Sequence, residues 1–479
     1  MIQTFKRYPT YKDSGVPWLG NVPEHWQVER LKSSVINVIE QVPDRRSTDL
    51  YVALEHVESW TGRLRDAGPD VSFDSQVKRF RAGDVLFGKL RPYLAKVTRP
   101  SSNGVCVGEF LVLRPRVSEG SAPYVEYLLR SKPIIDAVST STFGAKMPRT
   151  DWGFVGSMAI TLPPLPEQTI IARYLNYMDR QIQRYIRAKQ KLIKLLNEQK
   201  QAILHQAVTH GLNSNVRLKF SGVEWLGEVP EHWEVIPLSR VLSQRKEKNN
   251  PVKTTDILSL SLKAGVIPYA EKGPGGNKSK DDISAYMLAY PGDIVVNSMN
   301  VVVGSVGLSR YFGAVSPVYY MLYLRQTDDF IEYFDAIFQD PVFQRSLFGL
   351  GNGIMYIESK TSGKLNTIRL RIPMAKLKRV LVPHPGPNEQ AAIIKFLADS
   401  STSLAKTIEK AQREIDLLNE YRTRLFADVV TGKLDVREAA AQLPEEPEES
   451  EVILEEDDSI NDEGEEFDDL EEVLEEVEV

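Results

Sequence analysis

Residues 12–26 read KDSGVPWLGNVPEHW, and residues 219–233 read KFSGVEWLGEVPEHW, with 12 identities in 15 positions at an offset of 207. We call these two segments head motif 1 and head motif 2. A second set of repeats follows at an offset of 222: Glu167-Gln168, LLNE at 195–198 and VT at 208–209 recur as Glu389-Gln390, LLNE at 417–420 and VT at 430–431. Internal repetition constrains the architecture before any single element does. The chain therefore contains two copies of one module, each with a head motif, a variable body and a helical segment.

The composition is that of an ordinary globular protein with several structural units. Of the 479 residues, 42% are hydrophobic and 26% are charged, so we expect three or four units with cores of their own. The one cysteine, Cys106, excludes an internal disulfide and suits a reducing compartment. The sequence has no secretory apolar segment near its start and no run approaching 18 apolar residues, so we predict a cytoplasmic protein without a membrane span.

The formal net charge of −6 hides two regions of opposite sign. Residues 445–479 contain 20 of the 65 acidic residues and no lysine or arginine, so residues 1–444 carry 45 acidic against 59 basic residues, a net charge of +14. A block of like charge with few apolar groups stays disordered, and we predict a disordered acidic tail over 441–479. The basic remainder indicates a surface that binds a polyanion, with a generally solvated surface as the alternative.

Two long helices are the clearest predicted elements. We expect them over 167–211 and over 388–440, the second after a proline-rich stretch. Apolar residues recur in alternating steps of three and four, the spacing of a coiled-coil seam, and each helix would be about 65 Å long. We expect the two helices to pair with each other, antiparallel, as a spacer. The predicted seam residues are Leu175, Ile182, Ile186, Ile193, Leu196, Ile203 and Ala207 in the first helix, and Leu397, Leu404, Ile408, Ala411, Ile415, Leu418, Leu425 and Val429 in the second.

Four charged residues fall at core-type positions of this seam: Asp179, Lys189, Lys200 and Arg422. Polar residues in a coiled-coil core fix register and orientation at some cost in stability. We expect these four to fix the register of the pair.

The two bodies, residues 1–166 and 212–387, resemble each other only loosely. Both contain β-rich runs, and Gly83-Asp84 aligns with Gly292-Asp293 at an offset of 209, a turn of the kind that opens a strand. The predicted fold class is α+β, with two α/β bodies, two long antiparallel coiled-coil helices, an internal pseudo-two-fold repeat and the acidic tail.

Polar and basic loops follow the strands of both bodies, and they contain the side chains that DNA readout uses. Arg and Lys pair with guanine, Asn with adenine, and Tyr contacts phosphate. For any single residue a solvated surface charge is the simpler interpretation, but the clusters together favour DNA. The candidates are Lys89, Arg91, Tyr93, Lys96, Arg99, Lys146 and Arg149 in the first body, and Lys278, Lys280, Asn297, Asn300, Arg310, Lys360 and Lys364 in the second.

No catalytic motif is evident. The sequence contains no phosphate-binding GxxxxGK[ST] loop, no GxGxxG that opens a helix, no HExxH and no GxSxG. His25 and His232 repeat within the head motifs, and we interpret them as satisfied histidines in Trp-rich turns, with a shared polar contact as the alternative. The sequence favours a binding protein without catalytic, cofactor or metal residues.

The repeated SGVxWLGxVPxHW motif, each copy followed by a variable body and a helix that opens near Glu-Gln, resembles the specificity subunit of type I restriction–modification systems over residues 1 to about 440. The resemblance implies that 1–166 and 212–387 are target-recognition domains, each reading one half of a bipartite, asymmetric site in double-stranded DNA. It implies that 167–211 and 388–440 are spacer helices. It also implies that the chain is non-catalytic and directs adenine-N6 methylation and ATP-dependent cleavage by partner subunits.

The implied partners are two methyltransferase (modification) subunits and a restriction (translocase) subunit. S-adenosylmethionine, ATP and Mg are expected in those partners and not in this chain. We expect partner contacts at Glu167, Gln168, Asn197, Glu198, Glu389, Gln390, Asn419 and Glu420. The acidic tail departs from the family pattern, and a solubilising extension, a DNA-mimicking lid and a partner contact are all open.

The expected mechanism is geometric. Phosphate contacts give salt-dependent affinity, loops of the two domains read successive major grooves, and the helices hold them roughly 10 bp apart. The alternative is a coiled-coil scaffold that binds protein partners without DNA. That alternative predicts exposed apolar patches in place of cationic loops.

Overall fold

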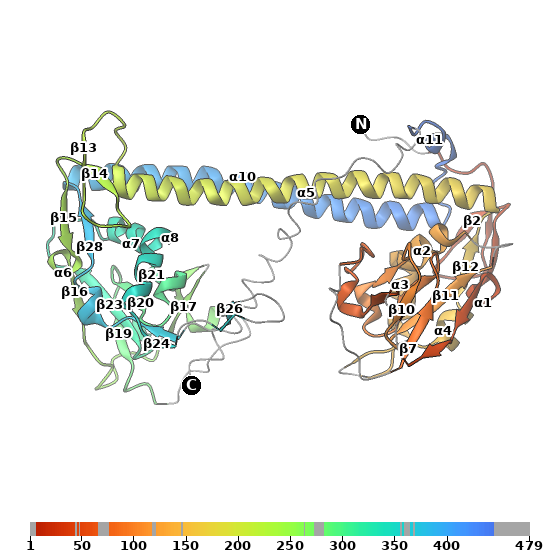
Figure 1. The fold of residues 1–479 in the computed structure, drawn as a ribbon, viewed down its shortest axis with the longest axis horizontal. Coiled ribbons are helices and arrows are strands. Elements are labelled where there is room, and N and C mark those ends of the chain that lie inside the picture. The colour runs from red at the N-terminus through yellow and green to blue at the C-terminus, as the bar shows by residue number, and fades with distance from the viewer. Residues whose placement is uncertain are drawn as a thin grey trace. The chain divides into compact units, whose positions relative to one another are not determined.

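The computed structural model of the chain describes residues 6–43, 46, 48–65, 76–116, 121–144, 147–262, 264–272, 282–354, 357–358, 365–366 and 369–444 (Figure 1). Within these residues the chain forms two compact units. Unit 1 contains residues up to 189 together with 413–444, and unit 2 contains 190–412. Of the acidic tail predicted to be disordered over 441–479, residues 445–479 lie outside the described residues, whereas Ala441 belongs to the short helix α11 (Arg437–Ala441).

Each head motif is a β-hairpin that ends on a buried tryptophan. In unit 1, β1 (Tyr11–Asp13) pairs antiparallel with β2 (Asn21–Pro23), and Trp26 is fully buried. In unit 2, β13 (Leu218–Phe220) and β14 (Glu228–Pro230) pair in the same way, and Trp233 is fully buried. The repeated sequence therefore forms a repeated structure.

The body of unit 1 is built on an antiparallel four-stranded sheet with the order β4-β11-β8-β9. All four residues of β8 are buried, because the sheet is covered on both faces. The sheet strands are β4 (Val35–Val38), β8 (Val85–Gly88), β9 (Val97–Thr98) and β11 (Phe110–Pro115). A second, mixed sheet has the order β5-β7-β10-β6, from β5 (Gln41–Val42), β6 (Leu50–Val52), β7 (Val77–Phe80) and β10 (Gly104–Cys106).

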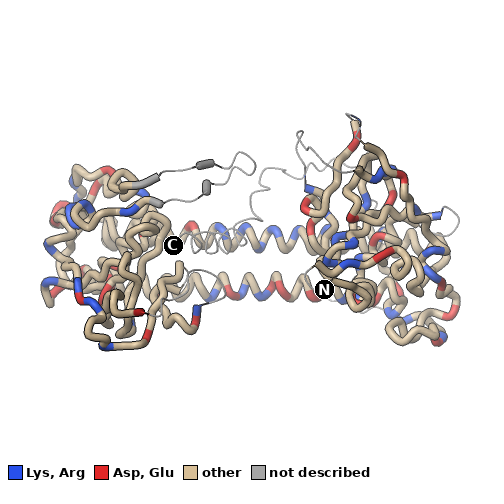
Figure 2. Tube along the Cα trace, turned by 90° about the horizontal axis from the view of Figure 1, so that it is seen from below, with Lys and Arg blue, Asp and Glu red and all other residues tan. Residues whose placement is uncertain are grey.

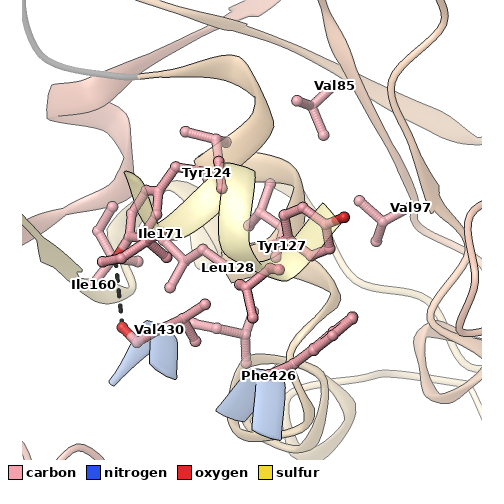
Figure 3. Close-up of a cluster of buried hydrophobic side chains, with 14 of the residues drawn as sticks. Val85, Val97, Tyr124, Tyr127, Leu128, Ile160, Ile171, Phe426 and Val430 are labelled. Atoms are coloured by element: carbon pink, nitrogen blue, oxygen red, sulfur yellow. Dashed lines mark hydrogen bonds between the residues drawn. The ribbon is translucent and has the colours of Figure 1, made fainter. Parts of the chain in front are cut away.

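The helices α2 (Ala122–Arg130) and α3 (Lys132–Thr140) follow β11 and pack their apolar faces into the main core of unit 1. Figure 3 shows this core, in which Tyr124, Tyr127 and Leu128 lie against Phe426 and Val430 of the second long helix. The remaining elements of unit 1 are β3 (Gln27–Arg30), α1 (Leu31–Ser34), η1 (Leu54–His56), η2 (Pro92–Leu94), α4 (Trp152–Ser157), β12 (Ala159–Leu162), which pairs with β3, and α11 (Arg437–Ala441).

Unit 2 repeats the main sheet strand for strand, in the order β16-β23-β20-β21. These strands begin 207 or 209 residues after β4, β11, β8 and β9, the offsets found in the sequence. They are β16 (Leu242–Arg245), β20 (Ile294–Asn297), β21 (Val306–Leu308) and β23 (Tyr319–Leu324). The helices α7 (Ile331–Gln339) and α8 (Pro341–Ser346) take the places of α2 and α3. The predicted internal repeat is thus confirmed at the level of strand order.

The other elements of unit 2 follow the plan of unit 1 only in part, since among the described residues their strands form two-stranded sheets and not a second four-stranded sheet. They are β15 (Glu234–Pro237), paired with β28 (Leu381–His384), α6 (Leu238–Val241), β17 (Leu258–Ser261), β18 (Gly265–Pro268), η3 (Tyr269–Glu271), β19 (Met287–Ala289), η4 (Val301–Val303), β22 (Gly313–Val315), η5 (Phe348–Leu350), β24 (Asn352–Ile354), β25 (Ile357–Glu358), β26 (Leu365–Asn366), β27 (Arg369–Arg371) and α9 (Met374–Leu377).

The Gly-Asp turn before β8 and before β20 has the same structure in both units. Asp84 and Asp293 are both almost fully buried. Asp84 accepts two hydrogen bonds from Arg114, at 2.8 and 2.7 Å, and these bonds raise the pKa of the guanidinium. Asp293 accepts two from Arg245, at 2.8 and 3.0 Å. The two arginines come from non-equivalent strands, β11 and β16. The aspartate therefore has the same position in both units, but its arginine partner does not.

The two long helices are α5 (Leu165–His210) and α10 (Pro387–Val430). The second ends at Val430 and not at the expected 440, because Gly432 takes a left-handed φ of 74° and a separate short helix, α11, follows. Each predicted seam residue is buried or half-buried, which confirms the seam. Lysine and arginine alternate with acidic residues along α10, whereas the charged residues of α5 are mostly lysine and arginine (Figure 2).

Contacts within unit 1 show that the helices are antiparallel. In unit 1, Asp179 of α5 pairs with Arg422 of α10, and Lys189 pairs with Glu414, so numbers rise along one helix as they fall along the other. Three of the four charged seam residues therefore behave as expected. Lys200 does not, because its side chain is exposed. No helix among the described residues has the length and apolar character needed to cross a membrane.

Candidate nucleic-acid interface

A glutamate near the start of each long helix, buried in unit 1 and half-buried in unit 2, connects that helix to its head motif. In unit 1, Glu167 Oε2 lies 2.8 Å from His25 Nε2, and its Oε1 accepts a hydrogen bond of 2.7 Å from the Tyr8 hydroxyl. In unit 2, Glu389 Oε2 lies 3.0 Å from His232 Nε2 and accepts one of 2.9 Å from Trp233 Nε1. The repeated histidines are thus satisfied side chains in a Trp-rich turn, as interpreted from the sequence.

The glutamine that follows each glutamate holds the body to its helix. The Gln168 side-chain oxygen accepts from the Ser121 amide at 2.8 Å, and its nitrogen donates to the Pro163 carbonyl at 2.9 Å. Gln390 makes the equivalent bonds with the Phe330 amide at 3.0 Å and the Pro385 carbonyl at 3.0 Å. Both glutamines are fully buried. The two Glu-Gln pairs, expected at a partner surface, therefore act inside their own units.

The other half of the predicted partner set lies on the surface. Asn197 and Glu198 on α5 and Asn419 and Glu420 on α10 are exposed. In unit 1, Asn419 and Glu420 line a groove of about 960 Å³ between α10 and α3. The groove is also lined by Trp18, Lys132, Pro133, Asp136, Ala137, Thr140, Thr423, Arg424 and Ala427.

Several predicted DNA-binding residues of unit 1 come together at one edge of its body. Arg91 is exposed, with a left-handed φ of 49°, and its amide donates to the Pro148 carbonyl at 2.8 Å. Arg149 is exposed and contacts Glu109 at 3.1 Å. The Thr150 amide donates to the Lys89 carbonyl at 3.1 Å, which ties the two segments side by side. Tyr93, on η2, is 49% exposed. We call Lys89, Arg91, Tyr93 and Arg149 the basic tip of unit 1.

Lys96 and Arg99, in the same stretch of sequence, form hydrogen bonds within the body of unit 1. Lys96 Nζ donates to the Leu54 carbonyl at 2.7 Å, and Arg99 Nε donates to Glu126 at 3.0 Å. Because these two side chains are half-buried as well as engaged with the protein, unlike the exposed Arg149, we leave Lys96 and Arg99 out of the proposed interface.

Unit 2 gives a smaller described set. Asn297 is buried, and its side-chain oxygen accepts from the Met299 amide at 3.0 Å, so it shapes a turn and does not face a ligand. Asn300 is half-buried beside η4, and Arg310 is exposed after β21. Lys278, Lys280, Lys360 and Lys364, like Lys146 of unit 1, lie outside the described residues.

Two apolar residues at the basic tip were not predicted as site residues. Phe143 is 60% exposed and Met147 is 55% exposed, within a loop that the sequence analysis treated as polar and basic. The signal available in the sequence was the presence of these two large apolar side chains among Ser, Thr, Gly, Lys and Arg.

Comparisons with known proteins agree with this architecture. No family model matches the sequence. The chain is 22% identical over 456 residues to the putative type I restriction enzyme MjaX specificity subunit of Methanocaldococcus jannaschii, a match that covers 88% of this chain and 96% of that one. It is 24% identical over 164 residues to the type I restriction enzyme EcoDI specificity subunit of Escherichia coli, covering 32% of this chain and only about a third (35%) of that relative.

A solved chain has the same fold. It comes from a structure described as "Structural basis underlying complex assembly and conformational transition of the type I R-M system", and it superposes with a TM-score of 0.62 at 18% identity, covering 86% of this chain and 99% of that chain. The fold is therefore that of a two-module protein with two α/β bodies and two long helices. The chain is similar to type I restriction enzyme specificity subunits along nearly its whole length, which confirms the resemblance noted in the sequence.

Proposed function

We propose that this chain is the DNA-recognition subunit of a type I restriction–modification system and reads a bipartite, asymmetric site in double-stranded DNA. The observation that carries the proposal is a main sheet repeated strand for strand in two bodies whose loops differ: the basic tip of unit 1 contains Arg91 and Arg149, whereas the equivalent segment of unit 2 contains Asn300. One scaffold with two unlike loop sets suits two unlike half-sites.

Binding combines two kinds of contact. Arginine and lysine at the basic tip and across the +14 body neutralise phosphates and give affinity that is independent of sequence. Side chains of the tip loops then contact base edges in the major groove, where each base pair presents a distinct pattern of donors and acceptors. The chain supplies recognition alone, and adenine-N6 methylation and ATP-dependent cleavage belong to methyltransferase and restriction subunits.

The methyltransferase subunits dock on the repeated helix surface. Support comes from the position of the LLNE repeat: Leu195, Asn197, Leu417 and Asn419 are exposed, although two of them are leucines. A leucine kept on the surface in both copies suits an interface, since an apolar side chain gains when it is buried. The groove beside Asn419 and Glu420 extends this surface onto α3.

The helices also determine the gap between the two half-sites. Each of them continues without a break through the residues at which the units divide. An insertion of seven residues in each helix keeps the seam in phase and adds about 10 Å of helix, which corresponds to roughly three base pairs. Both recognised halves would be unchanged while the gap widens by about that number, as read from the methylated motif. An unchanged gap contradicts this role.

The simplest test of DNA binding is a titration of the full chain with mixed-sequence duplex DNA over a series of salt concentrations. We expect the logarithm of the affinity to fall linearly and steeply with the logarithm of the salt concentration. A scaffold that binds only proteins would show no such slope, and that result contradicts the proposal.

A further inference from the structure

The apolar end of the basic tip has a feature that phosphate and base-edge contacts do not use. Phe143 and Met147 are 60% and 55% exposed and lie on one short loop between α3 and α4. Single exposed apolar residues are common on protein surfaces. Here two large apolar side chains lie on the same loop beside two exposed arginines, and this arrangement is less common than a single exposed apolar residue.

This loop is closed and anchored by backbone hydrogen bonds. The Phe143 amide donates to the Arg149 carbonyl at 3.1 Å, and the Arg149 amide donates to the Phe143 carbonyl at 3.0 Å. The Arg91 amide then donates to the Pro148 carbonyl at 2.8 Å, so the loop is fixed to the segment that precedes η2. Phe143 therefore projects from a defined backbone position at the base of the loop.

The charges around the loop identify the kind of surface that it fits. Arg149 is the backbone partner of Phe143, and Arg91 is the backbone partner of Pro148. Both arginine side chains are exposed, and Tyr93 adds a half-exposed ring close to Arg91 in the sequence. An apolar end flanked by cations is complementary to duplex DNA, which has an apolar base stack between two rows of phosphates.

We propose that Phe143, with Met147 beside it, is an apolar wedge that enters the DNA at the half-site read by unit 1 and partly unstacks one base step. Arg91 and Arg149 hold the phosphates on either side. The inference deepens the proposed function and rests on it. A methyltransferase must rotate its target base out of the duplex, and a base step that is already unstacked lowers the cost of that rotation. Part of the equivalent segment of unit 2 lies outside the described residues, so the inference concerns one half-site.

The test uses the full chain and a duplex that the wild-type chain selects from a random library. Adenines of the selected site are replaced one at a time by 2-aminopurine, whose fluorescence rises when it is unstacked. We expect binding of the wild-type chain to raise the fluorescence at one step. Phe143→Ala abolishes that rise and weakens binding about tenfold, the scale of one lost stacking contact. It leaves the salt slope unchanged because no charge is removed.

Two variants serve as controls. Phe220→Ala removes a phenylalanine that is 77% exposed on β13 and belongs to a head motif, and it is expected to behave as the wild type. Arg149→Ala lowers the salt slope by about one unit, unlike Phe143→Ala.

Three outcomes would overturn the wedge. The first is a Phe143→Ala variant with undiminished affinity and fluorescence. The second is a wild-type chain that binds its selected duplex without any fluorescence rise. The third is a Phe143→Ala variant that changes from dimer to monomer in sedimentation while its DNA binding is intact, which would make the tip a contact between two copies of the chain. Failure of the wild-type chain to select or bind any duplex is a different result, since it rejects the proposed function itself.

Discussion

Arg422 Nε on α10 lies 2.6 Å from Asp179 Oδ1 on α5, and the arginine is only 4% exposed. The same guanidinium donates to the Trp60 carbonyl at 3.0 Å, in a loop of the body, and lies over the Phe426 ring at 4.7 Å. One side chain therefore joins both helices and the body of unit 1. At an offset of 222 the corresponding residues are Ser401 and Lys200, which cannot form an ion pair. The ion pair between Asp179 and Arg422 therefore belongs to unit 1, and the corresponding residues of unit 2 do not form it.

Removal of one member of this pair is expected to be costly. Arg422→Met leaves the Asp179 carboxylate with Arg130 at 3.7 Å as its remaining cation. Loss of one partner of a buried pair costs about 3–5 kcal/mol of unfolding free energy, measurable by urea denaturation. Lys200→Met, at the equivalent exposed position, should change stability by less than about 0.5 kcal/mol. Equal effects of the two substitutions would show that the pair does not fix the register.

The hydrogen bonds that Gln168 and Gln390 make within their own units give a second prediction. Gln168→Ala and Gln390→Ala each leave a backbone amide and a carbonyl without their partner, at a cost of about 1–3 kcal/mol of unfolding free energy per variant. Asn388→Ala, on an exposed position of the same helix start, is the matched control and should be nearly neutral. If the glutamines instead bind partner subunits, the alanine variants would unfold like the wild type and lose only assembly.

Asp335 on α7 makes the stability of unit 2 depend on pH. Burial raises the pKa of this carboxyl to about 6, and its Oδ1 is buried without a hydrogen-bond partner among the described residues. A raised carboxyl pKa means that the folded state favours the protonated form, so stability from this group is present below about pH 4 and is lost as the pH rises through about 6.

Asp335→Asn keeps a neutral side chain at every pH. Relative to the wild type, the variant is expected to gain about 2–3 kcal/mol at pH 8 and clearly less at pH 5. Thermal unfolding of both proteins at the two values measures the difference. A gain that is the same at both pH values would mean that ionisation of Asp335 is not its cause.

The basic tip predicts a change in salt dependence. Arg91→Ala and Arg149→Ala each remove one phosphate contact, so each is expected to reduce the slope of log affinity against log salt by about 0.9, and the double variant by about 1.8. Arg424→Ala serves as the control, because this side chain is 82% exposed but lies on α10, beside the partner groove. A slope that is unchanged by Arg91→Ala and Arg149→Ala would place the DNA contacts elsewhere.

The repeat, the seam and the antiparallel helices could be predicted from the sequence, because each depends on a residue spacing that occurs in both modules. Lys200 was wrongly placed in the seam. The seven-residue frame holds in this stretch, since Leu196 and Ile203 are half-buried, but the long stem of the lysine keeps its charged end in water.

Site residues were harder to predict, because residue type does not distinguish a ligand contact from an internal bond. Asn297 has the chemistry of an adenine reader, yet it accepts a hydrogen bond from its own turn. Gln168 and Gln390 occupy equivalent positions in the two modules. In the sequence, a repeated glutamine that holds its own unit together cannot be distinguished from one that contacts a partner. Phe143 was not predicted as a site residue, because most residues of the loop around it are polar and the loop was interpreted from those residues.

The central property proposed for this chain is that it chooses the DNA site. The direct measurement is the adenine methylome of a cell that expresses the chain together with its methyltransferase subunits, compared with the same cell without the chain. We predict a methylated motif that appears only with the chain and has two short specified parts separated by a fixed unspecified gap. A contiguous motif, or the same motif without the chain, would contradict it.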